Sequence, residues 1–167
     1  MTRPAVAVRP AVEADIPALL DIWNPQIRHS TITFSSEEKT AEGLAAMIAS
    51  RRAGGYEFLV AEEDGRLMGL ATYAQFRAGN GYAFSMEHTV ILSPDAWGRG
   101  VGRALMTAVE GHARDRGYHV MVAAVTGENA RGLGFHKALG YAEVGRMPQQ
   151  GRKFGRWLDL VLMQKLL

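Results

Sequence analysis

The sequence predicts an α/β protein, a mixed sheet with helices on its faces. Strand-like and helix-like patterns follow one another in the order β-α-α-β-β-β-α-β-α-β-β. The nearly continuous apolar run at residues 119–125 is typical of a strand that is covered on both faces. Over residues 85–105 a strand, a glycine-rich turn and a helix follow one another directly, as they do at many ligand sites of α/β proteins.

The strands are expected from period-two alternation and from turn signals. The dipeptide Asp64-Gly65, which favours a tight hairpin turn, joins the strands predicted at residues 56–62 and 67–74. The other strands are expected at residues 6–8, 84–92, 119–125, 141–144 and 157–166.

The helices are expected where apolar residues recur every three or four positions. The first covers residues 16–23 and stops at Asn24-Pro25, because proline disfavours helical backbone in the residue before it. A capping-box pattern at residues 35–38 predicts the start of the second helix, which Gly54-Gly55 closes. The residues between them, 27–34, are expected to be irregular. Two later helices, over residues 101–113 and 129–139, are closed by Gly117 and Gly140.

The composition fits one domain over residues 1–167, with 47% hydrophobic and 22% charged residues. A net charge of +2 argues against a nucleic-acid partner, and the basic pairs Arg51-Arg52 and Arg152-Lys153 are interpreted as solvated faces. The longest purely apolar run, residues 120–125, is too short to span a bilayer, and residues 1–4 lack the apolar core of a signal peptide. We therefore expect a cytoplasmic protein without a membrane partner.

No metal site is expected. The chain has no cysteine, which excludes disulfides, thiolate metal ligands and a cysteine nucleophile. Four of the histidines show no spacing that would suit a metal ion: His29, His88, His112 and His119.

Three alternating glycines, Gly98, Gly100 and Gly102, open a predicted helix. The first free amides of that helix, at the positive end of its dipole, would point at a ligand in the turn, and the natural ligand is a phosphate or pyrophosphate. The pattern is not a Walker loop, because no lysine follows, and a Rossmann fingerprint would place its third glycine one residue later. The alternative is a turn that only tightens the corner between strand and helix.

The glycine turn resembles the R/Q-x-x-G-x-G/A loop with which GNAT acetyltransferases hold the pyrophosphate of acetyl-CoA. Residues 129–141, NARGLGFHKALGY, resemble the closing motif of that family, and the element order is that of the GNAT fold. Residues 86–90, MEHTV, and 151–160, GRKFGRWLDL, are similar to the phosphinothricin and methionine sulfoximine N-acetyltransferase branch. This resemblance, over nearly the whole chain, implies acetyl-CoA as co-substrate, a small amino acid or analogue as acceptor, and a homodimer.

Glu87 is the acidic residue of the strand at 84–92, and period-two alternation places it on one face with Thr89 and Ile91. Acetyl transfer to an amine requires the neutral amine, and a carboxylate can remove the proton directly or through one water. The resemblance implies this role for Glu87. The residues alone allow equally a solvated Glu87 at a sheet edge, or one paired with an arginine.

His136 occupies the position at which many family members carry a tyrosine that returns a proton to the departing thiolate. A histidine, with an ordinary pKa of about 6.5, can do the same, and the resemblance implies this role for His136. Without the resemblance, His136 is interpreted as a partly exposed residue of a helix.

The resemblance also implies the remaining binding residues. Backbone of one strand would pair with the pantetheine arm and polarise the thioester carbonyl, through Val90, Ile91 and Leu92. Backbone of the turn would hold the pyrophosphate, through Gly98, Arg99, Gly100, Val101, Gly102 and Arg103, with Asn129 touching the cofactor further along. The acceptor would meet Phe34, Arg77, Glu87, His88 and Thr89, where the forked guanidinium of Arg77 suits a carboxylate or phosphinate.

Three departures from the family pattern are Ala96-Trp97 for Gln-Arg, Gly132 for serine, and a loop at residues 78–81 without proline. The first loses a side-chain contact to phosphate, so that the backbone must suffice. With no cysteine to carry an acyl group, transfer would be direct, in one ternary complex. Two other functions stay open: transfer to a protein N-terminus or a polyamine, and a catalytically silent CoA-binding module.

Overall fold

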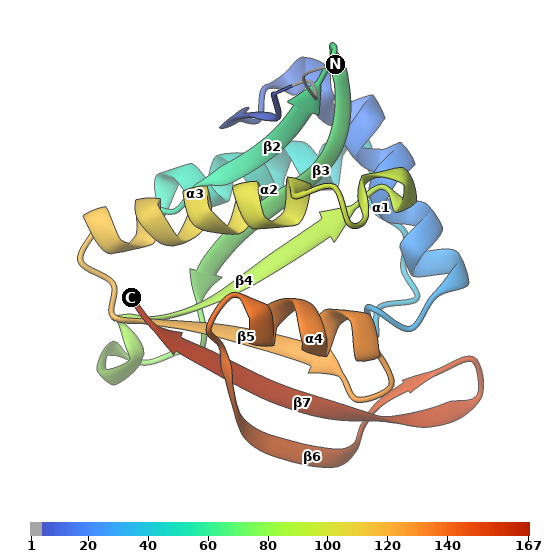
Figure 1. The fold of residues 1–167 in the computed structure, drawn as a ribbon, viewed down its shortest axis with the longest axis vertical. Helices are drawn as coiled ribbons and strands as arrows, with labels where there is room; N and C mark the ends of the chain where they lie inside the picture. The colour runs from blue at the N-terminus through green and yellow to red at the C-terminus, as the bar shows by residue number, and fades with distance from the viewer. Residues whose placement is uncertain (1–4) are drawn as a thin grey trace.

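The computed structural model describes residues 5–167, in which four α-helices surround one seven-stranded sheet (Figure 1). The strands are β1 (Ala7–Pro10), β2 (Phe58–Glu63), β3 (Arg66–Gln75), β4 (Ser85–Leu92), β5 (Val120–Thr126), β6 (Ala142–Lys153) and β7 (Arg156–Leu166). The helices are α1 (Ile16–His29), α2 (Ala41–Ala53), α3 (Val101–Asp115) and α4 (Ala130–Ala138). This order confirms the predicted one. The expectation about a signal peptide concerns residues 1–4, which lie outside the described part.

The sheet has the strand order β1-β2-β3-β4-β5-β7-β6, and each neighbouring pair is antiparallel except β4 and β5. The parallel pairing of β4 with β5 begins at Ser85 opposite Val120 and ends at Glu87 opposite Val122. Beyond this pair the two strands diverge (Figure 1). The middle of the sheet is therefore open on one side, and this opening positions the site.

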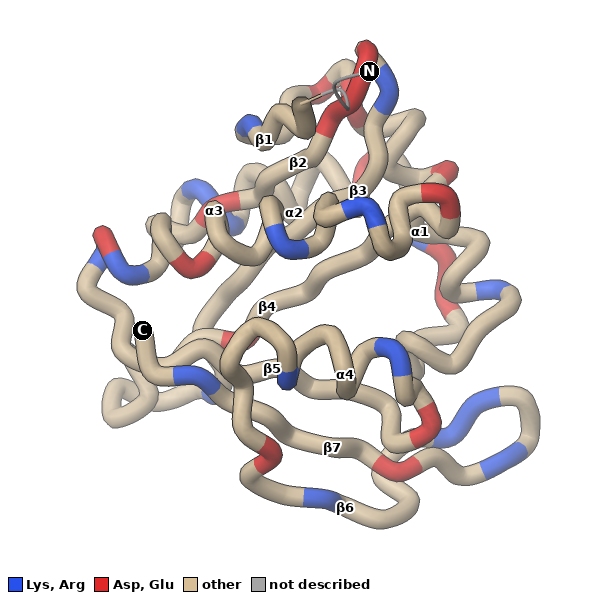
Figure 2. Tube along the Cα trace, viewed as in Figure 1, with Lys and Arg blue, Asp and Glu red and all other residues tan. Residues whose placement is uncertain are grey.

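Two hydrophobic clusters lie on opposite faces of the sheet. One packs α1 and α2 against the sheet and includes Leu19, Leu44 and Ile91. The other lies beneath α3, with Leu105 and Met121 among its members, and side chains of α4 pack against it. β4 and β5 are nearly without charged residues in Figure 2, as expected for central strands covered on both faces.

Two predicted boundaries near the first helices are wrong. α1 does not stop at Asn24-Pro25 but continues to His29. Proline removes one backbone donor from a helix, and the buried side chain of Ile27 holds the next turn against the core. The start of α2 is not at residues 35–38, because Thr40 is its N-cap and its Oγ1 accepts the third amide of the helix at 3.0 Å.

β6 is much longer than the strand predicted at residues 141–144. It runs to Lys153, with irregular pairing between Met147 and Gly151. Residues 145–153 are mostly polar and show no alternation of apolar and polar positions, so their sequence does not indicate a strand. The turn into β7 is made by Phe154 and Gly155, at φ +51° and +74°. Most residues of β6 are exposed, and this strand is held chiefly by its ladder with β7.

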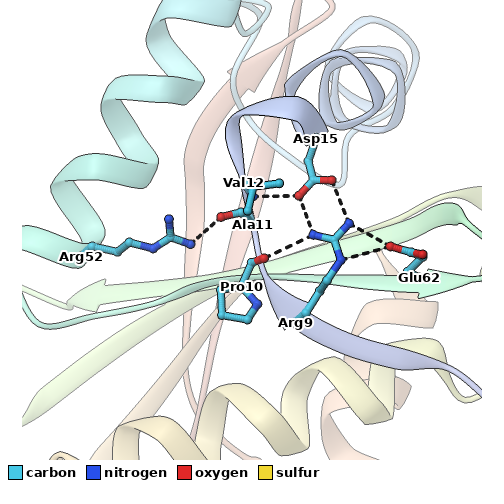
Figure 3. A network of polar contacts seen from close by, with 7 residues as sticks. All are labelled: Arg9, Pro10, Ala11, Val12, Asp15, Arg52 and Glu62. Atoms are coloured by element: carbon cyan, nitrogen blue, oxygen red, sulfur yellow. Dashed lines mark hydrogen bonds and ion pairs between the residues drawn. The ribbon is translucent and has the colours of Figure 1, made fainter.

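A network of ion pairs and hydrogen bonds joins β1 to its neighbours at the N-terminal edge of the sheet (Figure 3). The guanidinium of Arg9 donates to both carboxylate oxygens of Asp15, at 2.8 and 2.9 Å, and to Glu62 of β2. These hydrogen bonds lower the pKa of the Asp15 carboxyl. From α2, Arg52 donates to the carbonyl of Ala11 at 2.6 Å, so that strand, turn and helix are joined at one point.

Candidate active site

A cavity of about 660 Å³ lies where β4 and β5 part. Its walls come from both strands, from the glycine turn, from α4 and from the chain between α1 and α2. It is lined by these residues of the predicted site: Phe34, His88, Thr89, Val90, Ile91, Leu92, Gly98, Gly100, Gly102, Arg103, Asn129 and His136. One cavity therefore brings together residues from Phe34 to His136, which are 102 positions apart in the sequence.

Four residues of the predicted site do not line this cavity. Arg99 forms an ion pair with Glu63 of β2, and Val101 is fully buried in the core. Arg77 is exposed on the loop after β3, with its guanidinium 5.4 Å from the centre of the Tyr82 ring. The fourth residue is Glu87.

The alternating glycines serve two different purposes. Gly98 and Gly100 have φ values of +70° and +83°, which other L-residues rarely adopt, and a Cβ at either would meet open space. Gly102 lies inside the first turn of α3, where a Cβ would come within 2.9 Å of the Phe135 ring of α4. The turn thus stays uncovered at Gly98 and Gly100 while α3 and α4 approach closely, which a simple tight corner does not require.

The first amides of α3 are free. Within residues 5–167, no hydrogen-bond acceptor faces the N–H groups of Val101, Gly102 and Arg103. Trp97, just before the turn, has its ring 3.8 Å below the guanidinium carbon of Arg131, and both side chains line the cavity. Free amides at a helix N-terminus, with a cation nearby, form a site for an anion.

One edge of β4 is also free. Only every second residue of β4 forms backbone hydrogen bonds with β3. Just after the strand, for example, the amide of Ser93 donates to the carbonyl of Met68 at 2.9 Å, so the odd-numbered residues are the ones that bond to β3. By this alternation the backbone groups of Val90 and Leu92 point toward β5, whose pairing has already ended. The backbone of Ile91 pairs with Leu70 instead. An extended ligand could therefore pair with Val90 and Leu92 as an added strand.

Glu87 lies at the point where β4 and β5 part, in the fourth of seven strands. It is half-buried, and it has no ion pair or side-chain hydrogen bond within the described chain. Neither alternative, an exposed edge position or a pairing with arginine, therefore holds. Burial raises the pKa of the Glu87 carboxyl. Thr89, on the same face two residues further on, lines the cavity.

His136 is buried, not partly exposed, and it contacts a second histidine. Its Nδ1 lies 2.7 Å from the carbonyl oxygen of Gly132, and its Nε2 lies 2.9 Å from Nε2 of His88. A carbonyl only accepts, so Nδ1 of His136 carries a proton, and in the neutral ring Nε2 must accept. His88 therefore donates from Nε2, and its buried Nδ1 is left without a geometrically adequate partner.

Burial lowers the pKa of both rings. The pKa of His88 falls to about 3, chiefly by burial and then through the charge of His136, while the lowering for His136 comes from burial. The two rings are thus neutral near pH 7. Once protonated, His136 would be a stronger acid than an ordinary histidine.

The segment of residues 30–35, of which residues 32–35 form one wall of the cavity, is held by the C-terminal hairpin. The ammonium of Lys153, on a residue only 4% exposed, donates to the carbonyls of Ser30 and Thr33 at 2.7 and 2.9 Å. Gly151 packs against the ring of Phe34, where a Cβ would come within 2.6 Å. Lys153 is therefore not part of a solvated basic face, as the sequence had suggested.

Sequence reasoning also missed the charge of the cavity. Four cationic side chains line it, and no Asp or Glu is among its lining residues within the described chain. The four are Lys39, Arg51, Arg103 and Arg131. The pair Arg51-Arg52 was visible in the sequence, but nothing local distinguishes Arg51, which faces the cavity, from Arg52, which bonds to Ala11.

Residues 5–167 contain no group of three His, Asp or Glu side chains arranged as metal ligands. None of the helices in this part of the chain is both long and apolar enough to cross a membrane.

A central β4–β5 pair that parts beside a glycine turn with free helix amides is the arrangement of an acyltransferase of the GNAT type. The family model described as "Acetyltransferase (GNAT) family" matches residues 17–141, and the chain belongs to this family. The resemblance inferred from the glycine turn and the closing motif is thereby confirmed, as is the fold.

Relatives within the family carry related names. An L-methionine sulfoximine/L-methionine sulfone acetyltransferase of Salmonella typhimurium is 36% identical over 95% of this chain and 93% of its own length. A phosphinothricin N-acetyltransferase of Alcaligenes faecalis is 34% identical over 100% of this chain and 85% of its own length.

Solved structures superpose closely. The structure of yncA from Salmonella typhimurium, described as a putative acetyltransferase with its cofactor acetyl-CoA, has a TM-score of 0.93 and 36% identity over 98% of this chain and 94% of its own. The structure of a ribosomal-protein-alanine N-acetyltransferase of Brucella melitensis has the same TM-score of 0.93. It is 37% identical, over 96% of this chain and 99% of its own.

Proposed function

We propose that the protein is an acetyl-CoA-dependent N-acetyltransferase that acts on a small amino acid or an analogue of the methionine sulfoximine, methionine sulfone or phosphinothricin type. The observation that carries this proposal is a single cavity that joins the free amides of α3, the free edge of β4 and the buried His136. The names of the relatives support the same acceptor class.

The residues of the cavity fit acetyl-CoA as co-substrate. The amides of Val101, Gly102 and Arg103 suit its pyrophosphate, and the guanidinium of Arg131 adds a positive charge at the same place. The edges of Val90 and Leu92 suit the amide groups of its extended arm. Trp97 accepts from none of the first amides of α3, and its indole stacks with Arg131. Asn129 caps α4 through Oδ1, which leaves its amide nitrogen for a ligand.

Proton transfer would be divided between two side chains. Glu87, with a raised pKa, takes the proton of the amine directly or through one water, and the amine then attacks the thioester carbonyl. The N–C bond forms and the C–S bond breaks. The second proton of the attacking nitrogen passes to the neutral His136 and from it to the departing thiolate. Because no cysteine can hold an acyl group, transfer is direct within one ternary complex.

Three further features belong to the proposal. The chain acts as one domain over residues 1–167, in the cytoplasm, as a homodimer. The hairpin of β6 and β7 supports the dimer, because it exposes large apolar side chains that a second subunit could cover. These are Val144, Met147, Phe154 and Trp157.

A second candidate is transfer to a protein N-terminus, which the name of the Brucella structure favours. It differs from the first in the acceptor, since a peptide continues beyond the residue that carries the amine. A catalytically silent CoA-binding module is disfavoured, because His136 lines the cavity and Glu87 lies two residues before Thr89, which lines it on the same face of β4.

The test is release of free CoA thiol from acetyl-CoA by the purified protein. Methionine sulfone, methionine sulfoximine and phosphinothricin are each supplied as acceptor, alongside an alanine-initiated peptide, spermidine and a reaction without acceptor. We expect release with the amino-acid analogues only. Release confined to the peptide would select the second candidate, and tight acetyl-CoA binding without release from any amine would select the silent module.

A further inference from the structure

The four cations of the cavity lie on different elements. Arg103 and Arg131 belong to the first turns of α3 and α4, beside the glycine turn. Lys39 and Arg51 come from the chain before α2 and from the last turn of α2, on the other face of the sheet. A phosphate group at the glycine turn would engage the first pair. It leaves the second pair without an anion.

Arg51 is a cation without an internal partner. Its Nε is fully buried and has no hydrogen-bond acceptor, and its guanidinium makes no ion pair with any residue from 5 to 167. Burial accordingly lowers the pKa of Arg51. A guanidinium whose Nε is shielded from water and has no acceptor is unfavourable in the free protein. An anionic ligand group in the cavity would satisfy it, with two parallel hydrogen bonds in the case of a carboxylate.

Lys39 is held close to this region. The side-chain amide of Asn24 brackets its backbone, donating to the carbonyl at 3.0 Å and accepting from the amide at 2.8 Å. Its ammonium lies 4.9 Å from the centre of the Trp23 ring, which also lines the cavity. A second positive charge thus faces the same side of the cavity as Arg51, with its backbone fixed by α1.

These cations open onto the face of β4 that carries the proposed base. Ile91 packs with the cluster of α1 and α2, so Glu87 and Thr89, on the same face, are turned toward that layer. Arg77, the cation expected from the sequence, lies outside the cavity. Glu87 itself does not line the cavity, but Thr89, two residues further on the same face, does. An acceptor that reaches this face from the cavity would therefore meet Arg51 rather than Arg77 with its anionic group.

We propose that Arg51, assisted by Lys39, binds the carboxylate of the acceptor, so that the substrates are free α-amino acids and their analogues. This inference rests on the proposed acetyl transfer. It excludes the other acceptors on physical grounds. A polyamine is repelled by four cations, and a peptide N-terminus has an amide where the free amino acid has its carboxylate.

The experiment compares methionine sulfone with its carboxamide, which keeps the amine and removes the negative charge. The ratio of kcat/KM for the acid to that for the amide is measured in wild type, Arg51→Gln, Arg51→Lys and Arg77→Gln. Arg114→Gln, an exposed arginine of α3 without an ion pair, serves as control. Because hydrogen bonds to a charged group are strong, we expect Arg51→Gln to lower the ratio by about tenfold to a hundredfold. Arg51→Lys should retain part of it.

A binding measurement separates this inference from the proposed function. Calorimetric titration of methionine sulfone into the complex with CoA reports the anion contact without turnover, and Arg51→Gln should weaken this binding by a similar factor. An unchanged acid-to-amide ratio in Arg51→Gln, or its loss in Arg77→Gln alone, would overturn the inference while acetyl transfer stands. Absence of thiol release with every amine would instead reject the proposed function. Melting temperatures confirm that the variants fold. Since Arg51 has no internal partner, we expect the melting temperature of Arg51→Gln to equal that of wild type.

Discussion

Glu87 is unusual because a carboxylate in the middle of a sheet has no partner in the described chain. The carboxylates of Asp15, Glu63 and Glu110 are as buried or more so, and each has a cation beside it. An unpartnered acid of this kind destabilises the fold slightly unless it neutralises, which is why its pKa rises. Such a position is explained by chemistry more readily than by stability.

Replacing Glu87 with glutamine should therefore slow acetyl transfer without harming the fold. We expect kcat to fall by about a hundredfold or more, because a general base contributes that much, while the Kd for acetyl-CoA stays unchanged. Steady-state kinetics and calorimetric titration measure the two quantities. Glu42→Gln, at an exposed position of α2, is the matched control. Wild-type turnover in Glu87→Gln would remove Glu87 from the mechanism.

The histidine pair should leave a signature in the pH dependence of stability. His88 has a folded-state pKa of about 3 against about 6.5 when unfolded, so the unfolded state binds more protons between these values. Stability is thus complete above pH 6.5 and is lost as the pH falls toward 3. From pH 6.5 to 5 the contribution of His88 amounts to about 2 kcal/mol.

Urea unfolding at the two pH values measures this effect. We expect His88→Asn to lose less stability than wild type on acidification, by about that amount, whereas the exposed His119→Asn behaves as wild type. Equal losses in wild type and His88→Asn would show that the ring is not held neutral by burial.

Among the elements, the C-terminal hairpin has a role that its sequence pattern did not reveal. Residues 151–160 marked the branch of the family, yet only the structure shows Lys153 joining the hairpin to the wall at residues 30–35. Local signals did predict the glycine turn, the Asp64-Gly65 hairpin and the cap at Asn129, because each depends on a few adjacent residues. The end of α1 and the length of β6 depend on tertiary packing, and there the local rules were wrong.

Lys153→Met should loosen the cavity wall at residues 30–35, which lies on the acceptor side in the proposed function. The two carbonyls lose a shared donor, so we expect the KM for the acceptor to rise several-fold while the KM for acetyl-CoA stays constant, since the wall lies apart from the glycine turn. Arg152→Gln, at the exposed neighbouring position, should match wild type. A parallel rise in both KM values would indicate general destabilisation instead.

At the scale of the whole molecule, the parted sheet determines what the sequence could and could not predict. The residues around the opening come from the N-terminal, the middle and the C-terminal part of the chain. The contact of His88 with His136 alone spans 48 positions. Motif matching found those whose backbone or type is characteristic, such as Gly98 and Gly100. It could not find Arg51 or Arg131, because their importance lies only in the direction that their side chains face.

The exposed apolar face of β6 and β7 leads to a prediction about assembly. We expect the protein to sediment at twice the mass of its chain, and Trp157→Glu to shift it toward the monomer by placing a charge on the covered face. Sedimentation velocity over a concentration series measures this, with Arg114→Gln as control. A wild-type protein that sediments as a monomer throughout would contradict the assignment.

The cavity with four cationic side chains and no acidic one has a practical consequence. Inorganic phosphate or sulfate carried over from purification will occupy it, since small oxyanions have the same recognition chemistry as the groups it is built to hold. Affinities measured in phosphate buffer will therefore fall below those measured in a zwitterionic buffer of equal ionic strength. The same competition makes a sulfate-rich crystallisation medium a poor choice for capturing a bound amino acid.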